Sequence, residues 1–311
     1  MRLRAAIVAS ALSACLLGAC EPPIPVGPGS QHAPVMVQVE NISAARPQSG
    51  LQDAAVVYEY LTEGGISRFS AIYTSPSKGK VGPVRSARLV TISLAKIYGA
   101  VLVFSGGSSF IKSQIQSDGI PNFDENSANG ALFRDPARAA PHNLYSDGSH
   151  LSNLVNSANA SPVSYSLWDR TSPTSVSGGQ PVQRFTVPVS NLETPTFTYD
   201  ASASGWRRAE SDTGAFVDAD TNQQLVASTV IVQQVTITPS SEVVDVNGQT
   251  GVEHQITGSG KAQVFTAGHE FDATWSQGDS GPPSFSSSGK PAPIAPGLVW
   301  ICLVATGSTA A

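Results

Sequence analysis

The sequence predicts an α/β (α+β) layered N-terminal domain followed by a smaller, mainly β domain. Between residues 34 and 170, short apolar runs alternate with stretches of helical spacing, as in layered α/β domains. Between residues 182 and 306, short β-rich runs are separated by Gly, Asn, Asp and Ser, and helical periods are scarce. Residues 171–181 (TSPTSVSGGQP) are of low complexity, so we expect them to link the two domains.

Turn-forming residues separate the predicted elements of the first domain. Pro83 is expected to open a helix that Gly99 ends in a left-handed conformation. A buried strand follows, and then a short helix that ends at Gly119. The predicted strands cover residues 35–39, 56–60, 69–74 and 101–104.

The first twenty residues predict export and lipidation. Two arginines precede an apolar run over residues 5–17, which is too short to remain as a membrane-spanning helix. The sequence Leu17-Gly18-Ala19-Cys20 fits a bacterial lipobox. Cleavage after residue 19 would leave Cys20 to carry acyl chains, and several chains make a stable anchor. The alternative is an ordinary signal peptide with a chance cysteine at its end.

Residues 20–33 would then form a lipidated cysteine followed by a Pro- and Gly-rich tether. The predicted location is the extracytoplasmic face of the bacterial cell membrane. The formal net charge is −5, and it becomes −7 without residues 1–19, because two arginines leave. An acidic chain is a poor candidate for nucleic acid binding. Of the three cysteines, only Cys302 remains free in the mature chain, in an apolar run typical of a buried thiol.

Arginines in loops are the main candidates for ligand binding. Arg85 and Arg88 are three residues apart at the predicted helix start, so both guanidiniums would lie on one face and suit an anion. Ser86 and nearby amides could complete such a site. The alternative is that the arginines pair with Glu40, Asp53, Glu59 and Glu63 in a structural network. The predicted ligand-binding residues are Arg46, Arg68, Arg85, Ser86, Arg88, Arg134 and Asn143.

Two residues are candidates for acid–base catalysis, His142 and Glu63. His142 follows Asp135 and two arginines, so Asp135 could orient its imidazole toward a bound ligand. A histidine that caps its own loop is the alternative. The sequence contains no nucleophile elbow, phosphate loop or dinucleotide fingerprint. It also lacks the close His/Cys/Asp spacing of a metal site, so we expect no metal and no cofactor.

Six blocks follow one another in a fixed order: ARPQSGL at residues 45–51, EGGISRF at 63–69, GPVRSAR at 82–88, GGS at 106–108, APHNLY at 140–145 and PGLVWI at 296–301. These blocks resemble the YerB-type bacterial lipoproteins, a two-domain family of unknown function. The resemblance spans about residues 33–306, and two positions depart from the pattern: Phe104 and Phe216 stand where histidines are expected. The resemblance implies an exported, lipid-anchored protein with an α/β domain and a smaller β-rich domain, and no established activity.

Two functions remain open from the sequence. The first is a non-catalytic envelope lipoprotein that binds an anionic wall component or a partner protein through an Arg-rich cleft. The second is an extracytoplasmic hydrolase or transferase that acts on a phosphodiester or glycan, with the arginines stabilising negative charge. A third interpretation assigns protein contacts to the β domain. The missing nucleophile motif favours the first.

Overall fold

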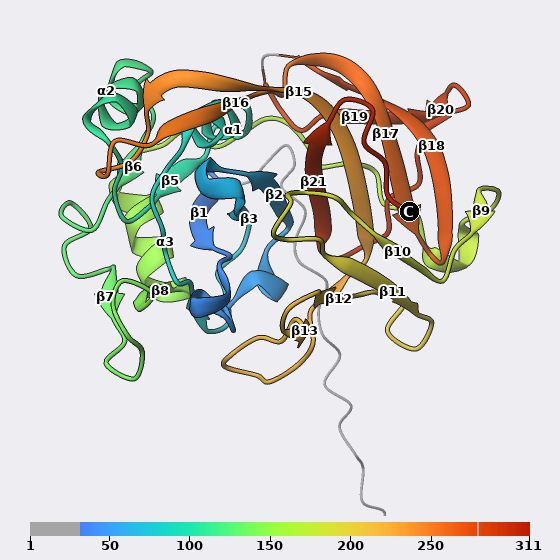
Figure 1. Cartoon of the computed structure of the whole chain (residues 1–311), viewed down its shortest axis with the longest axis horizontal. Coiled ribbons are helices and arrows are strands. Elements are labelled where there is room, and N and C mark those ends of the chain that lie inside the picture. Colours follow the sequence, from blue (N-terminus) through green and yellow to red (C-terminus); the bar gives the residue numbers. More distant parts are fainter. Residues whose placement is uncertain (1–31, 279) are drawn as a thin grey trace, which may run out of the picture.

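The computed structural model describes residues 32–278 and 280–311, and its core is a thirteen-stranded sheet (Figure 1). The predicted signal peptide, Cys20 and most of the predicted tether lie outside the described residues. The sheet order is β20 (Lys290–Pro291), β19 (Ser284–Ser287), β18 (His269–Gln277), β17 (Gly258–Thr266), β15 (Thr229–Val243), β21 (Val299–Ala305), β2 (Val56–Leu61), β3 (Ser67–Tyr73), β1 (Val35–Glu40), β5 (Val101–Val103) and β6 (Asn122–Phe123); β16 (Thr250–Gln255) also pairs with β15, and β9 (Gln180–Pro181) with β18.

Strand β21 joins the two halves of the chain into this one sheet. It pairs in parallel with β2 on one side and with β15 on the other, so Val299 lies in register with both Val56 and Thr229. Residues 299–304 are all buried. A strand covered on both faces reads as a continuous apolar run, which is the pattern of Val299-Trp300-Ile301-Cys302-Leu303-Val304. The two halves expected from the sequence therefore share a sheet.

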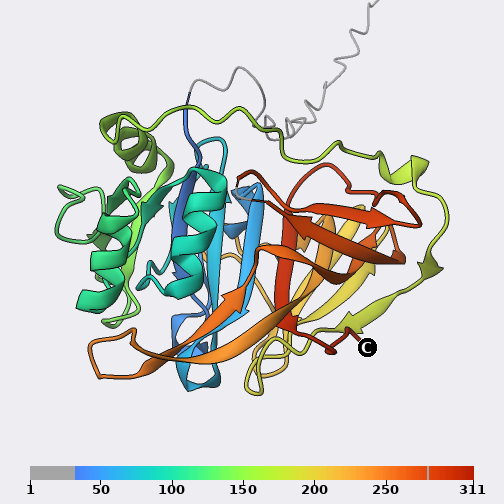
Figure 2. The ribbon, with the colours of Figure 1, turned by 90° about the horizontal axis from the view of Figure 1, so that it is seen from above.

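Three helices cover the N-terminal half of the sheet: α1 (Leu89–Tyr98), α2 (Ser109–Ser117) and α3 (Gly148–Ser157). Ile92 of α1 and Ile111 of α2 pack with Tyr58 in one buried cluster, whereas Leu151 of α3 packs with Val57 in the other. Successive strand residues point to opposite faces, so α1 and α2 cover one face and α3 the other (Figure 2). None of the helices in the described ranges has the length and apolar character of a membrane-crossing segment.

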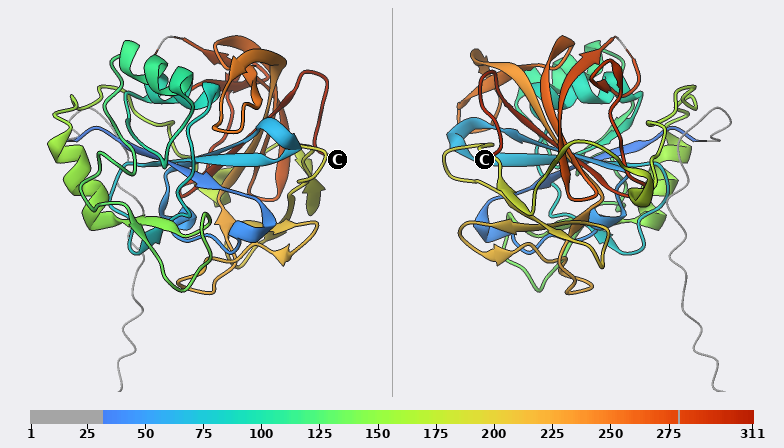
Figure 3. Two further views of the ribbon diagram at one scale, coloured as in Figure 1. Left: turned by 60° about the vertical axis from the view of Figure 1, so that its left-hand side comes forward. Right: turned by 90° about the vertical axis from the view of Figure 1, so that its right-hand side faces the viewer.

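Two smaller sheets complete the fold. The first packs an aromatic layer against the main sheet, where Phe185 stacks on Phe265 at 3.7 Å between ring centroids and meets Trp206 edge-on at 5.0 Å. Its strands are β10 (Arg184–Thr186), β11 (Thr196–Asp200), β12 (Gly205–Glu210), β13 (Gly214–Ala215) and β14 (Val226–Ala227). The second contains β4 (Lys80–Val81), β7 (Phe133–Arg134) and β8 (Leu144–Asp147), and short 3-10 turns cover Ser43–Ala45, Leu51–Asp53, Glu63–Gly65 and Pro173–Ser175. The α/β character of the first half and the β-rich second half are confirmed (Figure 3).

The prediction that Pro83 opens a helix is wrong. Helix α1 begins at Leu89, and the residues before it run along β1, where Val84 forms an isolated bridge with Val39. The amide of Arg85 donates to the carbonyl of Gln38 at 2.8 Å, so this segment pairs with β1 beyond the end of β5. The predicted end of the helix is confirmed, because Gly99 has a φ of 54° and its amide bonds back to Ala95 and Lys96.

Candidate functional site

A buried carboxylate, Glu40, brings two of the predicted site residues together. Nε of Arg85 lies 2.9 Å from Glu40 Oε1, and Nδ1 of His142 lies 2.8 Å from Oε2. Glu40 ends strand β1 and is almost fully enclosed, whereas the Arg85 side chain is 30% exposed and that of His142 is 19% exposed. The carboxylate therefore fixes a guanidinium and an imidazole that both still reach solvent.

The backbone around Glu40 explains how loops distant in sequence meet there. The amide of Glu40 donates to Pro83 O at 3.0 Å, and the amide of Val84 donates to Leu144 O at 2.6 Å. These bonds hold the loop before α1 between the end of β1 and the start of β8, which places Arg85 and His142 on either side of the same carboxylate. The Pro-containing blocks at residues 82–88 and 140–145 therefore lie side by side and form one site.

Arg68 lies directly behind this pair. It faces Glu40 in the antiparallel register of β1 and β3, it is 2% exposed, and its Nη1 donates to the carbonyl of Ser86 at 2.9 Å. Its Nε has no hydrogen-bond partner, and no carboxylate of the described residues lies within ion-pair distance. Burial and the neighbouring charge of Arg88 lower the pKa of Arg68 to about 10. Arg68 therefore stays protonated at neutral pH.

Arg88 is held by Glu63. Nε of Arg88 donates to both carboxylate oxygens at 2.8 and 2.7 Å, and both side chains are nearly buried. Burial alone would raise the pKa of Glu63, but the hydrogen bonds from Arg88 and the charge of Arg68 lower it. Glu63 is therefore an anion at neutral pH. Arg85 and Arg88 do not lie together on a helix face, because each turns to its own carboxylate.

Charge in this group does not balance. Arg88, Glu63 and Glu40 are the charged side chains that act on the pKa of Arg68, together with the Tyr60 hydroxyl, so these groups form one interacting cluster. With Arg85 included, the cluster holds three guanidiniums and two carboxylates. One positive charge is thus left over beside Ser86, whose carbonyl accepts a hydrogen bond from Arg68 and whose hydroxyl lies 3.4 Å from that of Ser105.

Other predicted ligand-binding residues are engaged with protein groups. Arg46 pairs with Glu193 at 3.0 Å and donates to the backbone of Asn41, with only 6% of its side chain exposed. Arg134 pairs with Glu125 and donates to Asn143 Oδ1, both at 2.8 Å. Asn143 in turn donates to two carbonyls of its own loop. These contacts order the loops around the Glu40 site.

Sequence reasoning did not single out a second buried charge cluster around Arg208. Nη2 of Arg208 lies 2.9 Å from Glu59 Oε1 and 2.6 Å from Glu210 Oε1, and all three side chains are enclosed. Nε1 of Trp300 also donates to Glu59 at 2.9 Å. Alternation along β12 is the available signal, since Trp206, Arg208 and Glu210 share its buried face while Arg207 between them is partly exposed.

Phe104 and Phe216, which stand where the family pattern has histidines, both belong to the core. The ring centroid of Phe216 lies 4.2 Å from the Arg208 guanidinium carbon, so the aromatic face covers a buried cation. Phe104 is 2% exposed and follows β5, before the Ser105-Gly106-Gly107-Ser108 turn. Neither position offers a titratable side chain in this chain.

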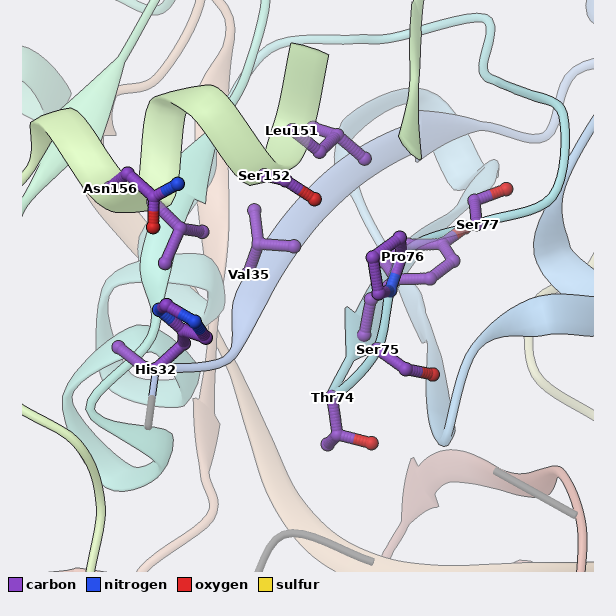
Figure 4. A pocket seen from close by; sticks show the side chains of 12 residues that line it. His32, Val35, Thr74, Ser75, Pro76, Ser77, Leu151, Ser152 and Asn156 are labelled. Atoms are coloured by element: carbon purple, nitrogen blue, oxygen red, sulfur yellow. The ribbon is translucent and has the colours of Figure 1, made fainter. Parts of the chain in front are cut away.

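An apolar pocket lies away from these charges, beside the start of the described chain (Figure 4). Its volume is about 340 Å³, and its walls come from β1, from the loop after β3 and from α3. Figure 4 shows Val35, Leu151 and Pro76 around it, with Ser152 and Asn156 at the helix side. Within residues 32–278 and 280–311, no group of three or more His, Cys, Asp or Glu side chains could hold a metal ion.

Taken together, the fold and the site define a two-part, sheet-linked protein with a cationic loop cluster and no recognised catalytic motif. The model described as “Protein of unknown function (DUF3048) N-terminal domain” matches residues 24–161, and the corresponding C-terminal domain model matches residues 185–301. The chain belongs to this DUF3048 family.

One relative and one solved structure agree with this assignment. The chain is 30% identical over 286 residues to “Putative lipoprotein YerB” of Bacillus subtilis, which covers 88% of this chain and 82% of the relative. The crystal structure of YerB from Bacillus subtilis matches with a TM-score of 0.75 and 25% sequence identity, over 91% of this chain and 94% of that one. The predicted family resemblance is confirmed.

Proposed function

We propose that this chain is an exported, lipid-anchored protein of the cell envelope that binds an anionic envelope component through the cluster around Arg85. The lipobox at Leu17-Gly18-Ala19-Cys20 and the lipoprotein name of the Bacillus subtilis relative support the anchor. The lipid would hold the protein on the extracytoplasmic face of the cell membrane. Replacing Cys20 by Ala should release the protein from the membrane fraction and abolish labelling with radioactive palmitate.

The unmatched guanidinium of Arg68 carries the binding proposal. A buried cation without an acidic partner is costly, and an anion bound nearby lowers that cost. Arg85 binds Glu40 through Nε and is 30% exposed, so its two terminal nitrogens are available to a phosphodiester or a carboxylate oxygen pair. His142 adds a ring nitrogen on the far side of Glu40. The ligand is a wall polymer with repeated anionic groups or an acidic segment of an envelope protein.

Binding of poly(glycerol phosphate) to the detergent-solubilised lipoprotein tests this proposal. Arg85→Ala should weaken binding at least about tenfold, because a hydrogen bond to a charged group contributes about 1.5–3 kcal/mol. Arg207→Ala is the matched control, since Arg207 is a surface arginine that pairs with Asp200. An equal loss of affinity in both variants would show that binding depends on overall charge, and it would contradict a site at Arg85.

The His142–Glu40 contact favours one second candidate, a hydrolase or transferase acting on a phosphodiester or glycan. A carboxylate bound to Nδ1 orients an imidazole so that Nε2 can take a proton. Glu63 is the weaker catalytic candidate, because its lowered pKa keeps it from carrying a proton. Turnover of a phosphodiester or glycan substrate that disappears in His142→Gln, with polymer binding retained, would favour the enzyme over the binding protein.

A further inference from the structure

A small groove is lined by residues of α1, α2 and β16, and it shares no residue with the Arg85 cluster. Its volume is about 240 Å³. Apolar walls come from Ile92 and Phe110, and four polar residues also line it: Ser93, Gln114, Glu253 and His254. Ligand pockets commonly measure about 300–1,000 Å³, so this groove fits one ring-sized group rather than an extended chain.

His254 is the unusual member of the lining. It is 7% exposed, and neither ring nitrogen has a hydrogen-bond partner among the described residues. Its ring packs edge-on against Tyr60, with 5.8 Å between centroids. Burial lowers the pKa of His254 to about 4, so the imidazole is neutral at neutral pH. A neutral imidazole needs one acceptor for its N–H and one donor for its other nitrogen.

The charges at the groove disfavour an anion. Among the residues that the structure describes, Glu253 forms no ion pair, and the lining of the groove contains neither Lys nor Arg. Nearby cations are already paired, Arg88 with Glu63 and Lys112 with Asp124. Ser93 and Gln114 each donate and accept hydrogen bonds. The matching group is therefore uncharged, and both donates and accepts through the same atoms, as a hydroxyl does.

We propose that this groove binds a single uncharged sugar ring, such as one residue of a glycan. Sugar hydroxyls would bond to His254, Gln114 and Ser93, after a rotation about the Cβ–Cγ bond of His254 turns a ring nitrogen to the groove. The C–H face of the ring would pack on Phe110. This site goes beyond the anion site, since it takes a ligand of different chemistry and shares no residue with it.

NMR titration of the full chain with N-acetylglucosamine and with glucose tests the proposal. We expect saturable shifts confined to α1, α2 and β16 with at least one neutral sugar, and weaker binding of glucuronate than of glucose because of Glu253. His254→Phe should weaken binding at least tenfold without lowering the melting temperature, since it removes two unpaired polar atoms while keeping a ring against Tyr60.

Two further variants keep the outcome interpretable. Ser93→Ala should also weaken sugar binding, whereas Gln116→Ala on the exposed side of α2 should not change it. Arg85→Ala should retain sugar binding, which separates this site from the anion site. The proposal is overturned if neither neutral sugar causes shifts, or if the shifts lie outside the groove. It is also overturned if folded His254→Phe binds as tightly as the wild-type chain, or if glucuronate binds more tightly than glucose.

Discussion

Arg208 and Glu59 form an enclosed ion pair across the junction between the two halves of the chain. Nη2 of Arg208 lies 2.9 and 3.1 Å from the two carboxylate oxygens of Glu59, although the residues are 149 positions apart. Burial raises the pKa of Glu59, and the charge of Arg208 opposes that rise. Glu59 also accepts a hydrogen bond from Trp300 of β21, the strand that joins both halves. The ion pair is therefore connected to the main sheet.

Removing one partner of this pair should destabilise the whole fold. Arg208→Met leaves Glu59 and Glu210 buried without their shared cation, so we expect the free energy of unfolding to fall by about 3–5 kcal/mol. Urea unfolding measures this loss. Arg207→Met, on the exposed side of the same strand, is the control and should change little. A loss below about 1 kcal/mol in Arg208→Met would contradict the role of the pair.

Glu193 should make stability fall between mildly acidic and neutral pH. Burial and the nearby charge of Glu59 raise its pKa from 4.5 to about 7, despite hydrogen bonds from Ser67. The folded state thus binds this proton more tightly than the unfolded state. The resulting stabilisation is complete below pH 4.5 and is lost as the pH rises through 7.

The variant Glu193→Gln isolates this effect, because the amide resembles the protonated acid. We expect the decrease in unfolding free energy between pH 4.5 and 7 to be smaller in the variant than in the wild-type chain. Urea midpoints at half-unit pH steps measure it. Parallel pH profiles for both chains would show that Glu193 titrates with its ordinary pKa.

Gly148 should tolerate no side chain. It begins α3 beneath the loop after β3, where an added Cβ would overlap the backbone oxygen of Ser77. Gly148→Ala should lower the free energy of unfolding by about 2–3 kcal/mol, since the backbone at Ser77 or at the start of α3 must move. Gly106→Ala is the matched control, because an added Cβ there meets nothing within 4 Å. A melting temperature equal in the two variants would argue against this close approach.

Local patterns predicted most strands but not their partners. The apolar runs of β1, β2, β3 and β5 and the Gly99 helix end follow from the sequence alone. The start of α1 does not, because Pro83 suits both a helix start and an extended segment beside a strand. Only pairing with β1 decides between them. The insertion of β21 beside β2 is equally hidden, since register between segments more than 200 residues apart leaves no local trace.

The sequence indicated which residue types form the site, but it did not indicate which side chains pair with one another. Arg85 and His142 stand out because their blocks adjoin Gly and Pro, but sequence spacing cannot show that they share Glu40. Spacing also suggested a common face for Arg85 and Arg88, and the extended segment before α1 separates them. Arg208 escaped attention because its acidic partner Glu59 comes from the other half of the chain.

The most direct measurement is a crystal of the protein soaked with a short glycerol phosphodiester. We expect density for a phosphate group within hydrogen-bond distance of the Arg85 guanidinium and the Ser86 hydroxyl, with Glu40 still bound to Arg85. Density for the ligand only at other surfaces, or an unchanged Arg85 environment at saturating concentration, would contradict an anion site built on the spare guanidinium charge.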